Sequence, residues 1–249
     1  MDLRDRKVIV TGGVRGLGRA MVEKLITKGA RLTVFDLDSA GLAELTMTHS
    51  AIEAMQCDVS DFDEVSKATE QYHSQNGACD VLINNAGILY SEPLIKISAE
   101  GLVKHDPATW NKVLAADLSS VFFMTSCVVE KMVATRTRGV ILNISSVSAG
   151  GNPGQSAYSA AKAGVNALTS VWSKELGPMG IRVIAVAPGF TETESTKEAM
   201  SEGVLRETTK RVPLRRLGKP EEIADGVIHV LENDFFNGKV FELDGGLVI

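Results

Sequence analysis

A tyrosine and a lysine four positions apart, Tyr158 and Lys162, lie in a segment whose pattern predicts a helix over 155–176. Residues at this spacing share one face of a helix, so the phenol and the ammonium group would be neighbours. A nearby cation favours the phenolate form of tyrosine, whose ordinary pKa is about 10. Such a tyrosine can exchange a proton with a substrate oxygen as a general acid or base. The same spacing is also common between surface residues that do no chemistry.

A hydroxyl group upstream of this pair is a second candidate, because Ser145 and Ser146 directly follow a predicted strand over 139–144. A hydroxyl at the carboxyl end of a strand can donate a hydrogen bond to an oxygen on which negative charge develops. The alternative interpretation is an ordinary serine turn.

A glycine-rich loop near the amino terminus separates a predicted strand over 8–11 from a predicted helix over 17–28. Glycine lets the backbone turn tightly and approach a ligand, and the helix directs free N–H groups at an anion such as a pyrophosphate. This strand–loop–helix setting favours a nucleotide site over a simple glycine turn. The loop consists of Thr11, Gly12, Gly13, Val14, Arg15, Gly16, Leu17 and Gly18.

The carboxylate of Asp36 follows the second predicted strand, about 20 residues after this loop, where it can bind ribose hydroxyls. It would repel a 2′-phosphate, so NAD is favoured over NADP. Arg15 favours the opposite preference, and an aspartate here can also simply cap a helix. Further short or small residues that follow the third and fourth strands fit contacts with a cofactor: Asp58, Val59, Asn85, Ala86 and Gly87.

Short β-branched runs alternate with helical patterns along the chain. Continuously apolar strands suit a parallel sheet covered on both faces, and the strand–helix repetition predicts a doubly wound α/β fold. We expect a single domain over 1–249 with a mainly parallel, seven-stranded sheet. The predicted strands are 8–11, 31–35, 51–57, 81–84, 139–144, 182–186 and 240–243. The predicted helices are 17–28, 39–47, 62–75, 109–133, 155–176 and 221–231.

Two stretches interrupt this alternation and are expected to be irregular, residues 88–108 and 190–219. Each follows a predicted strand, so each should lie at the carboxyl edge of the sheet, where open α/β sheets bind ligands. Both are candidates for shaping a substrate pocket, with 190–219 as its lid.

Composition argues against several other classes of protein. The balance of 26 Lys and Arg against 31 Asp and Glu gives a net charge of −5, which offers no electrostatic basis for binding nucleic acid. The scattered cysteines and histidines predict neither a disulfide framework nor a metal site. The charged amino terminus and the lack of about 18 successive apolar residues predict neither a secretion signal nor a membrane span. We expect a cytoplasmic protein.

The motifs taken together, in their order along the chain, resemble the short-chain dehydrogenase/reductase family over essentially its whole length. They are the glycine loop, Asn84-Asn85-Ala86-Gly87, the paired serines, Tyr158 with Lys162, and Ala187-Pro188-Gly189. The stretch Gly151–Gln155 is similar to that of the bacterial ketoacyl reductases. The resemblance implies a Rossmann-type domain that binds a dinucleotide.

The resemblance also implies roles for individual residues. Tyr158 would donate or accept the proton, and Lys162 would bind the nicotinamide ribose and tune the tyrosine. Asp36 would bind the adenosine ribose. The other cofactor contacts would come from Thr11, Gly12, Arg15, Gly16, Leu17, Gly18, Asp58, Val59, Asn85, Ala86, Gly87, Pro188, Gly189, Phe190 and Thr193.

This sequence departs from the family pattern at two places. Where the family usually has an asparagine that supports a water-linked proton path, this chain has Asp117. A carboxylate can hold a water but cannot donate as an amide does, so the path and its pH dependence should differ. The serine loop is one residue short. Ser146 matches the motif by its neighbours and Ser145 by its spacing to Tyr158, and we select Ser146 as the catalytic serine.

These observations predict an oxidoreductase that transfers a hydride between NAD(H) and a small secondary alcohol or ketone, with Tyr158, Lys162, Ser146 and Asp117 at the catalytic site. The alternatives are a 3-ketoacyl-thioester reductase and a nucleotide-binding regulator without activity. An epimerase or dehydratase of the same fold is less suited, because such relatives have wider glycine spacing and a larger carboxyl-terminal domain. By resemblance we expect a homotetramer, with the apolar end Leu247, Val248 and Ile249 suited to a subunit contact.

Overall fold

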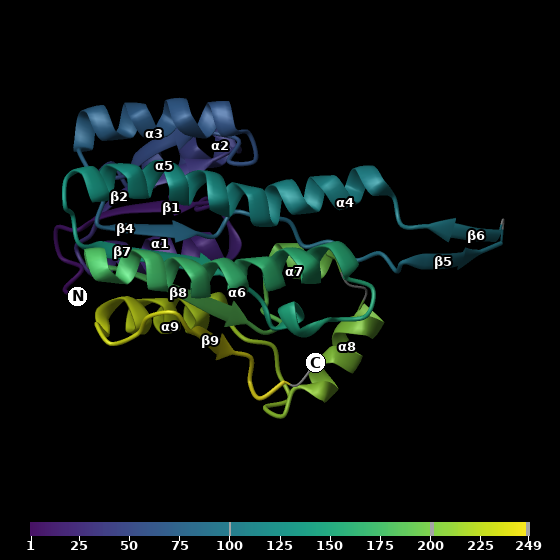
Figure 1. Ribbon diagram of the computed structural model, residues 1–249. Coiled ribbons are helices and arrows are strands. Elements are labelled where there is room, and N and C mark those ends of the chain that lie inside the picture. The colour runs from purple at the N-terminus through teal and green to yellow at the C-terminus, as the bar shows by residue number, and fades with distance from the viewer. Residues whose placement is uncertain (100, 200–201, 248–249) are drawn as a thin grey trace.

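The computed structural model describes residues 1–99, 101–199 and 202–247. Seven parallel strands form one sheet in the order β3-β2-β1-β4-β7-β8-β9 (Figure 1), which confirms the predicted fold class. The strands are β1 (Lys7–Thr11), β2 (Arg31–Asp36), β3 (Glu53–Gln56), β4 (Val81–Asn84), β7 (Gly139–Ile144), β8 (Ile181–Pro188) and β9 (Val240–Leu243). The helices over them are α1 (Gly16–Thr27), α2 (Ser39–Thr48), α3 (Phe62–Asn76), α5 (Ser120–Ala134), α6 (Ser156–Leu176) and α9 (Pro220–Glu232).

Two apolar layers, one on each face of the sheet, hold these elements together. Along β1, Val8 and Val10 belong to one buried cluster and Ile9 to the other, because successive side chains of a strand point to opposite faces. Helices α1, α2 and α9 contribute to the first cluster, and α3, α5 and the end of α6 contribute to the second. This double covering explains why the central strands are apolar at most of their positions.

The strand order reverses between β1 and β4. The chain winds outward from β1 through β2 to β3, then returns to pair β4 with the other side of β1. The connections that leave the carboxyl ends of these two strands therefore diverge, and they leave a crevice in which open α/β sheets bind ligands. The glycine loop follows β1, and the Asn85-Ala86-Gly87 segment follows β4, so both border this crevice.

One long helical run, Pro107–Ala134, crosses the face of the sheet beside α6. It consists of α4 (Pro107–Leu114), a π-helical turn (Ala115–Ser119) and α5. A π-turn accommodates an extra residue within a helix and often marks a functional site. Among the described residues this run alone is apolar and long enough to span a membrane, with a mean hydropathy of 1.5. The core helix of a globular fold passes the same test, and α5 packs on α3, β4 and β7.

The two stretches predicted to be irregular contain regular structure, so that prediction was wrong. Within 88–108, strands β5 (Ile95–Ser98) and β6 (Gly101–Lys104) form an antiparallel hairpin. Within 190–219 lie the short helices α7 (Glu194–Ala199) and α8 (Glu202–Arg211). These elements escaped prediction because they contribute little to the central core, so their sequences lack the burial pattern of the other strands and helices.

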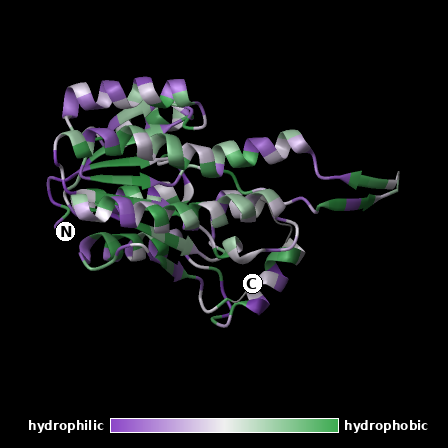
Figure 2. Cartoon of the chain, viewed as in Figure 1, coloured by the Kyte–Doolittle hydropathy of each residue, from purple (hydrophilic) through white to green (hydrophobic). Residues whose placement is uncertain are grey.

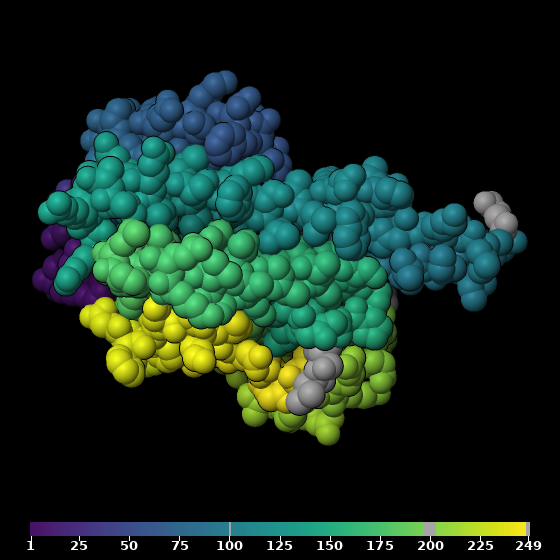
Figure 3. Space-filling view, in the orientation of Figure 1, coloured from purple at the N-terminus to yellow at the C-terminus, as the bar shows by residue number. Residues whose placement is uncertain are grey.

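The β5–β6 hairpin stands clear of the rest of the molecule as an arm (Figures 1 and 3). Its strands are exposed along almost their whole length, although they carry several large apolar side chains (Figure 2). Ile97 is 84% exposed and Leu102, its cross-strand partner, is 74% exposed. The pairing of β5 with β6 is therefore the main interaction that holds the arm together, and the core contributes little to it.

Candidate functional site

A cavity of about 340 Å³ opens at the carboxyl ends of the central strands. Every residue predicted to bind a cofactor or to take part in catalysis lines it, except Thr11. One end is lined by Gly12, Arg15, Gly16, Leu17, Gly18, Asp36, Asp58 and Val59. The rest of the lining includes Asp117, Ser146, Tyr158 and Lys162, together with Pro188, Gly189, Phe190, Thr191, Thr193, Ser195 and Thr196. The elements that surround it are the loops after β1, β2, β3, β4, β7 and β8, as the strand order requires.

The glycine loop is packed so closely that a side chain is excluded. A Cβ atom built on Gly18 would lie 1.9 Å from the carbonyl oxygen of Gly12, and Gly12 itself has a φ of +66°. Helix α1 begins at Gly16, and its first N–H groups have no intrahelical acceptors. The loop therefore offers exposed backbone donors and a positive helix end to an anion, which fits the pyrophosphate of a dinucleotide.

Thr11 and Asn85 join this loop to the segment after β4. The Thr11 hydroxyl accepts hydrogen bonds from the backbone N–H groups of Asn85 and Ala86, both at 3.0 Å. The Asn85 amide donates to the carbonyl oxygens of Thr11 at 3.0 Å and Gly12 at 2.8 Å. Thr11 is buried outside the cavity lining, so the structure gives it a bracing position rather than the predicted cofactor contact.

The Asp36 carboxylate lies at the far end of the cavity from the tyrosine. Its Oδ2 accepts a hydrogen bond from Val14 N at 3.2 Å, and its Oδ1 accepts one from Asp38 N at 3.0 Å. These two bonds fix the orientation of the carboxylate while leaving lone pairs on both oxygens for ribose hydroxyls. Arg15, from the glycine loop, lines the same end and is exposed.

The phenol, one serine and the lysine converge at the other end. Ser146 and Tyr158 line the cavity together, and the ammonium group of Lys162 lies 5.6 Å from the centre of the tyrosine ring. The Ser146 oxygen accepts from Ser148 N at 3.1 Å, which leaves its hydrogen available for donation. Ser145 instead donates to Asn166 Oδ1 at 2.6 Å. The geometry thus favours Ser146 as the serine that faces the reacting group.

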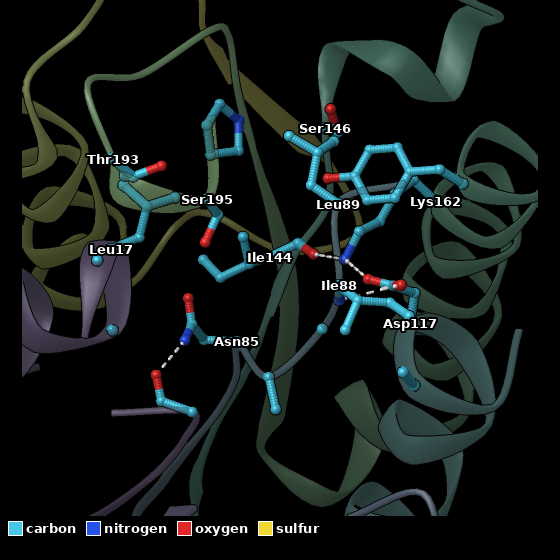
Figure 4. A pocket seen from close by; sticks show the side chains of 18 of the residues that line it. Leu17, Asn85, Ile88, Leu89, Asp117, Ile144, Ser146, Lys162, Thr193 and Ser195 are labelled. Carbon is cyan, nitrogen blue, oxygen red and sulfur yellow. Dashed lines mark hydrogen bonds and ion pairs between the residues drawn. The ribbon is translucent and has the colours of Figure 1, made fainter. Parts of the chain in front are cut away.

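Asp117 reaches the same end of the cavity from the π-turn, as Figure 4 shows. Its Oδ1 lies 3.3 Å from the Lys162 ammonium, and its Oδ2 accepts a hydrogen bond from Ile88 N at 3.2 Å. The ammonium also donates to the carbonyl oxygen of Ile144 at 3.0 Å. The side chains of Asp117 and Lys162 are 1% and 5% exposed, so this is a buried ion pair.

Comparison with known proteins decides the family. Residues 6–203 match the family model described as short chain dehydrogenase. The chain belongs to the short-chain dehydrogenase family. It is 36% identical to a 3-oxoacyl-[acyl-carrier-protein] reductase of Thermotoga maritima, with all of both chains covered. The expected resemblance is confirmed.

Other short-chain dehydrogenases show the same relationship. The chain is 34% identical to a (3R)-3-hydroxyacyl-CoA dehydrogenase of Canis lupus familiaris, covering 99% of this chain and 98% of the relative. It is also 34% identical to a sorbitol-6-phosphate 2-dehydrogenase of Klebsiella pneumoniae, with the same coverage. The solved structure entitled gox2181 superposes with a TM-score of 0.87 at 32% identity, covering 98% of this chain and 96% of that one.

Membership of this family makes the chain an oxidoreductase that transfers a hydride between a nicotinamide cofactor and a CH–OH or ketone carbon. The cavity fits such a cofactor, because the glycine loop and the α1 amino terminus lie at one end and ionisable groups lie at the other. One cavity thus extends from the glycine loop to the cluster of Tyr158, Lys162 and Asp117 in this short-chain dehydrogenase.

Burial changes the acidity of all three ionisable groups at the catalytic end. It raises the pKa of Tyr158, an effect that the Lys162 ammonium and the Ser146 hydrogen bond oppose and that Asp117 reinforces. The pKa of Lys162 is also raised, because the Asp117 carboxylate and Tyr158 outweigh the lowering caused by burial. Burial raises the pKa of Asp117 against the opposing effect of Lys162. The lysine therefore does not by itself bring the pKa of Tyr158 below the ordinary tyrosine value.

Several residues that position the site were not predicted. Ile88 and Ile144 act through backbone atoms, which bind Asp117 and Lys162 whatever their side chains are. Gln155 lines the cavity and donates to Ser91 at 3.1 Å. Only Gln155 had a sequence signal, since it lies in the Gly151–Gln155 motif.

A buried amide network ties the two central loops together. Asn84 donates to Asn143 Oδ1 at 2.9 Å and to Thr125 at 3.0 Å, and Asn143 donates to Thr169 at 2.9 Å. It joins β4, β7, α5 and α6 just below the catalytic end, so the loops that carry Gly87 and Ser146 have fixed relative positions.

Proposed function

We propose that this short-chain dehydrogenase interconverts a secondary alcohol and a ketone with NAD(H), using Tyr158 as the proton carrier. The observation that supports this most directly is the meeting of Tyr158, Ser146 and Lys162 in the same cavity as the glycine loop. A phenol beside a hydroxyl donor and a cation is suited to move a proton to or from a substrate oxygen.

Each group has a separate part in this proposal. The bound nicotinamide supplies or accepts the hydride. Tyr158 gives a proton to the ketone oxygen or takes it from the alcohol. Ser146 donates a hydrogen bond to the same oxygen, because its O–H is not used in the hydrogen bond that it accepts from Ser148 N. Lys162, held by Ile144 O and Asp117, supplies a fixed positive charge and a donor for the cofactor ribose.

Preference for NAD over NADP is proposed from the fixed Asp36 carboxylate. A 2′-phosphate at that position would meet a negative charge that cannot rotate away. Asp36→Asn should therefore lower the ratio of kcat/KM for NAD to that for NADP by about tenfold, which corresponds to about 1.4 kcal/mol. Steady-state kinetics with both cofactors would measure the ratio.

The neighbouring carboxylate provides a matched control. Asp38 caps α2 through Ala40 N and Gly41 N and does not line the cavity, so Asp38→Asn should leave the ratio unchanged. Adding Arg15→Ala to Asp36→Asn should reduce NADP use again if Arg15 attracts the phosphate. An unchanged cofactor ratio in Asp36→Asn would show that this carboxylate does not select the cofactor.

A 3-ketoacyl thioester is the second candidate substrate, because two relatives are named for thioester substrates of this kind. A panel of small secondary alcohols, their ketones and 3-oxoacyl thioesters, each assayed with both cofactors, would separate the candidates. Turnover of the small alcohols alone supports the first proposal, and turnover of the thioesters alone supports the second. Intact cofactor binding without turnover of any member would contradict both.

We further propose that 190–219 forms the lid of the substrate site, since Thr193, Ser195 and Thr196 line the cavity from the start of α7. We also propose a homotetramer in the cytoplasm. Exposed apolar side chains on α5 and α6, Phe122 and Val171, offer surfaces for contact between copies. Of the apolar end, Leu247 is buried, and Val248 and Ile249 lie outside the described residues.

A further inference from the structure

The carboxylate of Asp117 lies where the family usually has an uncharged amide, and it contacts the lysine that the tyrosine depends on. The two side chains come from different elements, the π-turn and α6, and both are almost completely buried. A negative charge in this position acts on Lys162 and Tyr158 without the screening that water gives at a surface.

We propose that Asp117 is a positioning residue that holds Lys162 as half of a buried ion pair and offsets its charge, so that Tyr158 keeps its proton to a higher pH than an unopposed lysine would allow. This inference rests on the proposed role of Tyr158 and deepens it. It assigns to one residue the control of when the phenol is ionised.

The carboxylate is held firmly in this position. Ile88 N binds one oxygen at 3.2 Å, and the ammonium lies 3.3 Å from the other. Gly87 makes the approach possible, because a Cβ atom there would lie 2.3 Å from Asp117 Oδ1. The ammonium also donates a hydrogen bond to Ile144 O, so moving away from the carboxylate would cost it that acceptor as well.

No third charged side chain among the described residues faces this cluster closely enough to replace Asp117. From α6 the facing groups are Tyr158 and Lys162, from the π-turn Asp117, and from the loop after β7 the uncharged Ser146. The other charged residues of the cavity lining are Arg15, Asp36 and Asp58, at the nucleotide end. The charge balance around Tyr158 therefore depends on one cation and one anion.

The sign of the effect follows from this balance. An ammonium group favours the phenolate, and a carboxylate disfavours it. Asp117 raises the pKa of Tyr158 in the same direction as burial does, and it raises the pKa of Lys162. At neutral pH the phenol is therefore protonated in the cofactor-free protein, which is the form that donates a proton to a ketone oxygen.

The test compares Asp117→Asn, which keeps the shape and the acceptor for Ile88 N, with the wild type. Phenolate absorbance in the ultraviolet would be followed during an alkaline titration of the cofactor-free protein, within the range where circular dichroism shows it folded. We expect the Tyr158 transition to move down by about 1 pH unit or more. The transition is assigned to Tyr158 by its disappearance when Tyr158→Phe is added.

Two further variants serve as controls for the titration. Glu70→Gln removes one exposed carboxylate on α3 and makes the same change in net charge, so it should leave the transition in place. Asp117→Ala removes the charge without supplying an amide and should shift the transition in the same direction as Asp117→Asn. If Asp117→Asn does not fold, Asp117→Ala can take its place in the titration.

The pH dependence of kcat gives a second test of the proposal. With an alcohol that the enzyme oxidises, the acid limb of the kcat profile should also move to lower pH in Asp117→Asn, because kcat reports the ionisation of Tyr158 in the complex with substrate and cofactor. A transition and a limb that stay in place while only the melting temperature changes would overturn the proposal and leave Asp117 a structural role. If no substrate is turned over, the proposed function fails, but the absorbance titration still decides the inference.

Discussion

Replacing Tyr158 with phenylalanine is expected to lower kcat by about 10³-fold, because it removes the group that carries the proton to the substrate oxygen. The ring remains, so the packing against Lys162 and the shape of the cavity are kept. Cofactor affinity should therefore change by less than about threefold, a loss under 1 kcal/mol. Steady-state kinetics and a fluorescence titration with NADH would measure the two quantities separately.

Tyr72 supplies a matched control for this substitution. It is a fully buried tyrosine in the apolar layer formed by α3 and α5, and it does not line the cavity. Tyr72→Phe removes a buried hydroxyl from the same kind of ring and should leave kcat unchanged. Near-normal turnover in Tyr158→Phe would remove Tyr158 from the mechanism, whereas equal losses in both variants would indicate a general disturbance of the fold.

Lys162→Met is expected to lower the free energy of unfolding by about 3–5 kcal/mol, because it leaves the Asp117 carboxylate buried without its cation. Methionine matches the length and the apolar stem of lysine, so little packing is lost. Adding Asp117→Asn should recover most of this loss, since no buried charge is then left unpaired. Urea unfolding of the wild type, both single variants and the double variant gives the coupling energy as a double-mutant cycle.

The pH dependence of this loss also has a defined sign. In Lys162→Met the isolated carboxyl has a folded-state pKa above its unfolded value of about 3.9. Such a group stabilises the folded protein below its unfolded pKa, and that contribution is lost as the pH rises through the folded pKa. The deficit should therefore be larger at pH 7 than at pH 5. Strictly additive effects of the two substitutions at both pH values would contradict the ion pair.

The central sheet could be predicted because its strands are buried on both faces. In β4 and β7 every residue is buried, and β-branched and leucine side chains dominate these strands, so the sequence carries a strong apolar signal. The alternation with amphipathic helices then leaves few possible arrangements. The β5–β6 arm has the opposite property. Its Ile95-Lys96-Ile97 alternation is a strand pattern, but three residues are too short a run to distinguish it from a loop.

The candidate site could be predicted as a set of residues but not as a set of contacts. The glycine loop, Asp36 and the Tyr158–Lys162 pair have local signals, and they fall in one cavity because the carboxyl ends of parallel strands share an edge. Thr11 carries the same loop signal, yet it faces inward, because successive residues of a strand alternate in direction. The Asp117–Lys162 ion pair joins residues 45 positions apart, and it depends on the local geometry of a helix.

The π-turn determines the direction in which the Asp117 side chain points. The π-turn over Ala115–Ser119 holds one residue more than an α-helical turn would. Each residue of an α-helix advances its direction by about 100°. Deleting Ala115 or Ala116, the two residues of this turn that precede Asp117, would restore a regular helix and turn the carboxylate away from α6. The negative charge opposite Lys162 therefore depends on two features of the sequence. One is the aspartate at position 117, and the other is the number of residues in the helical turn that carries it.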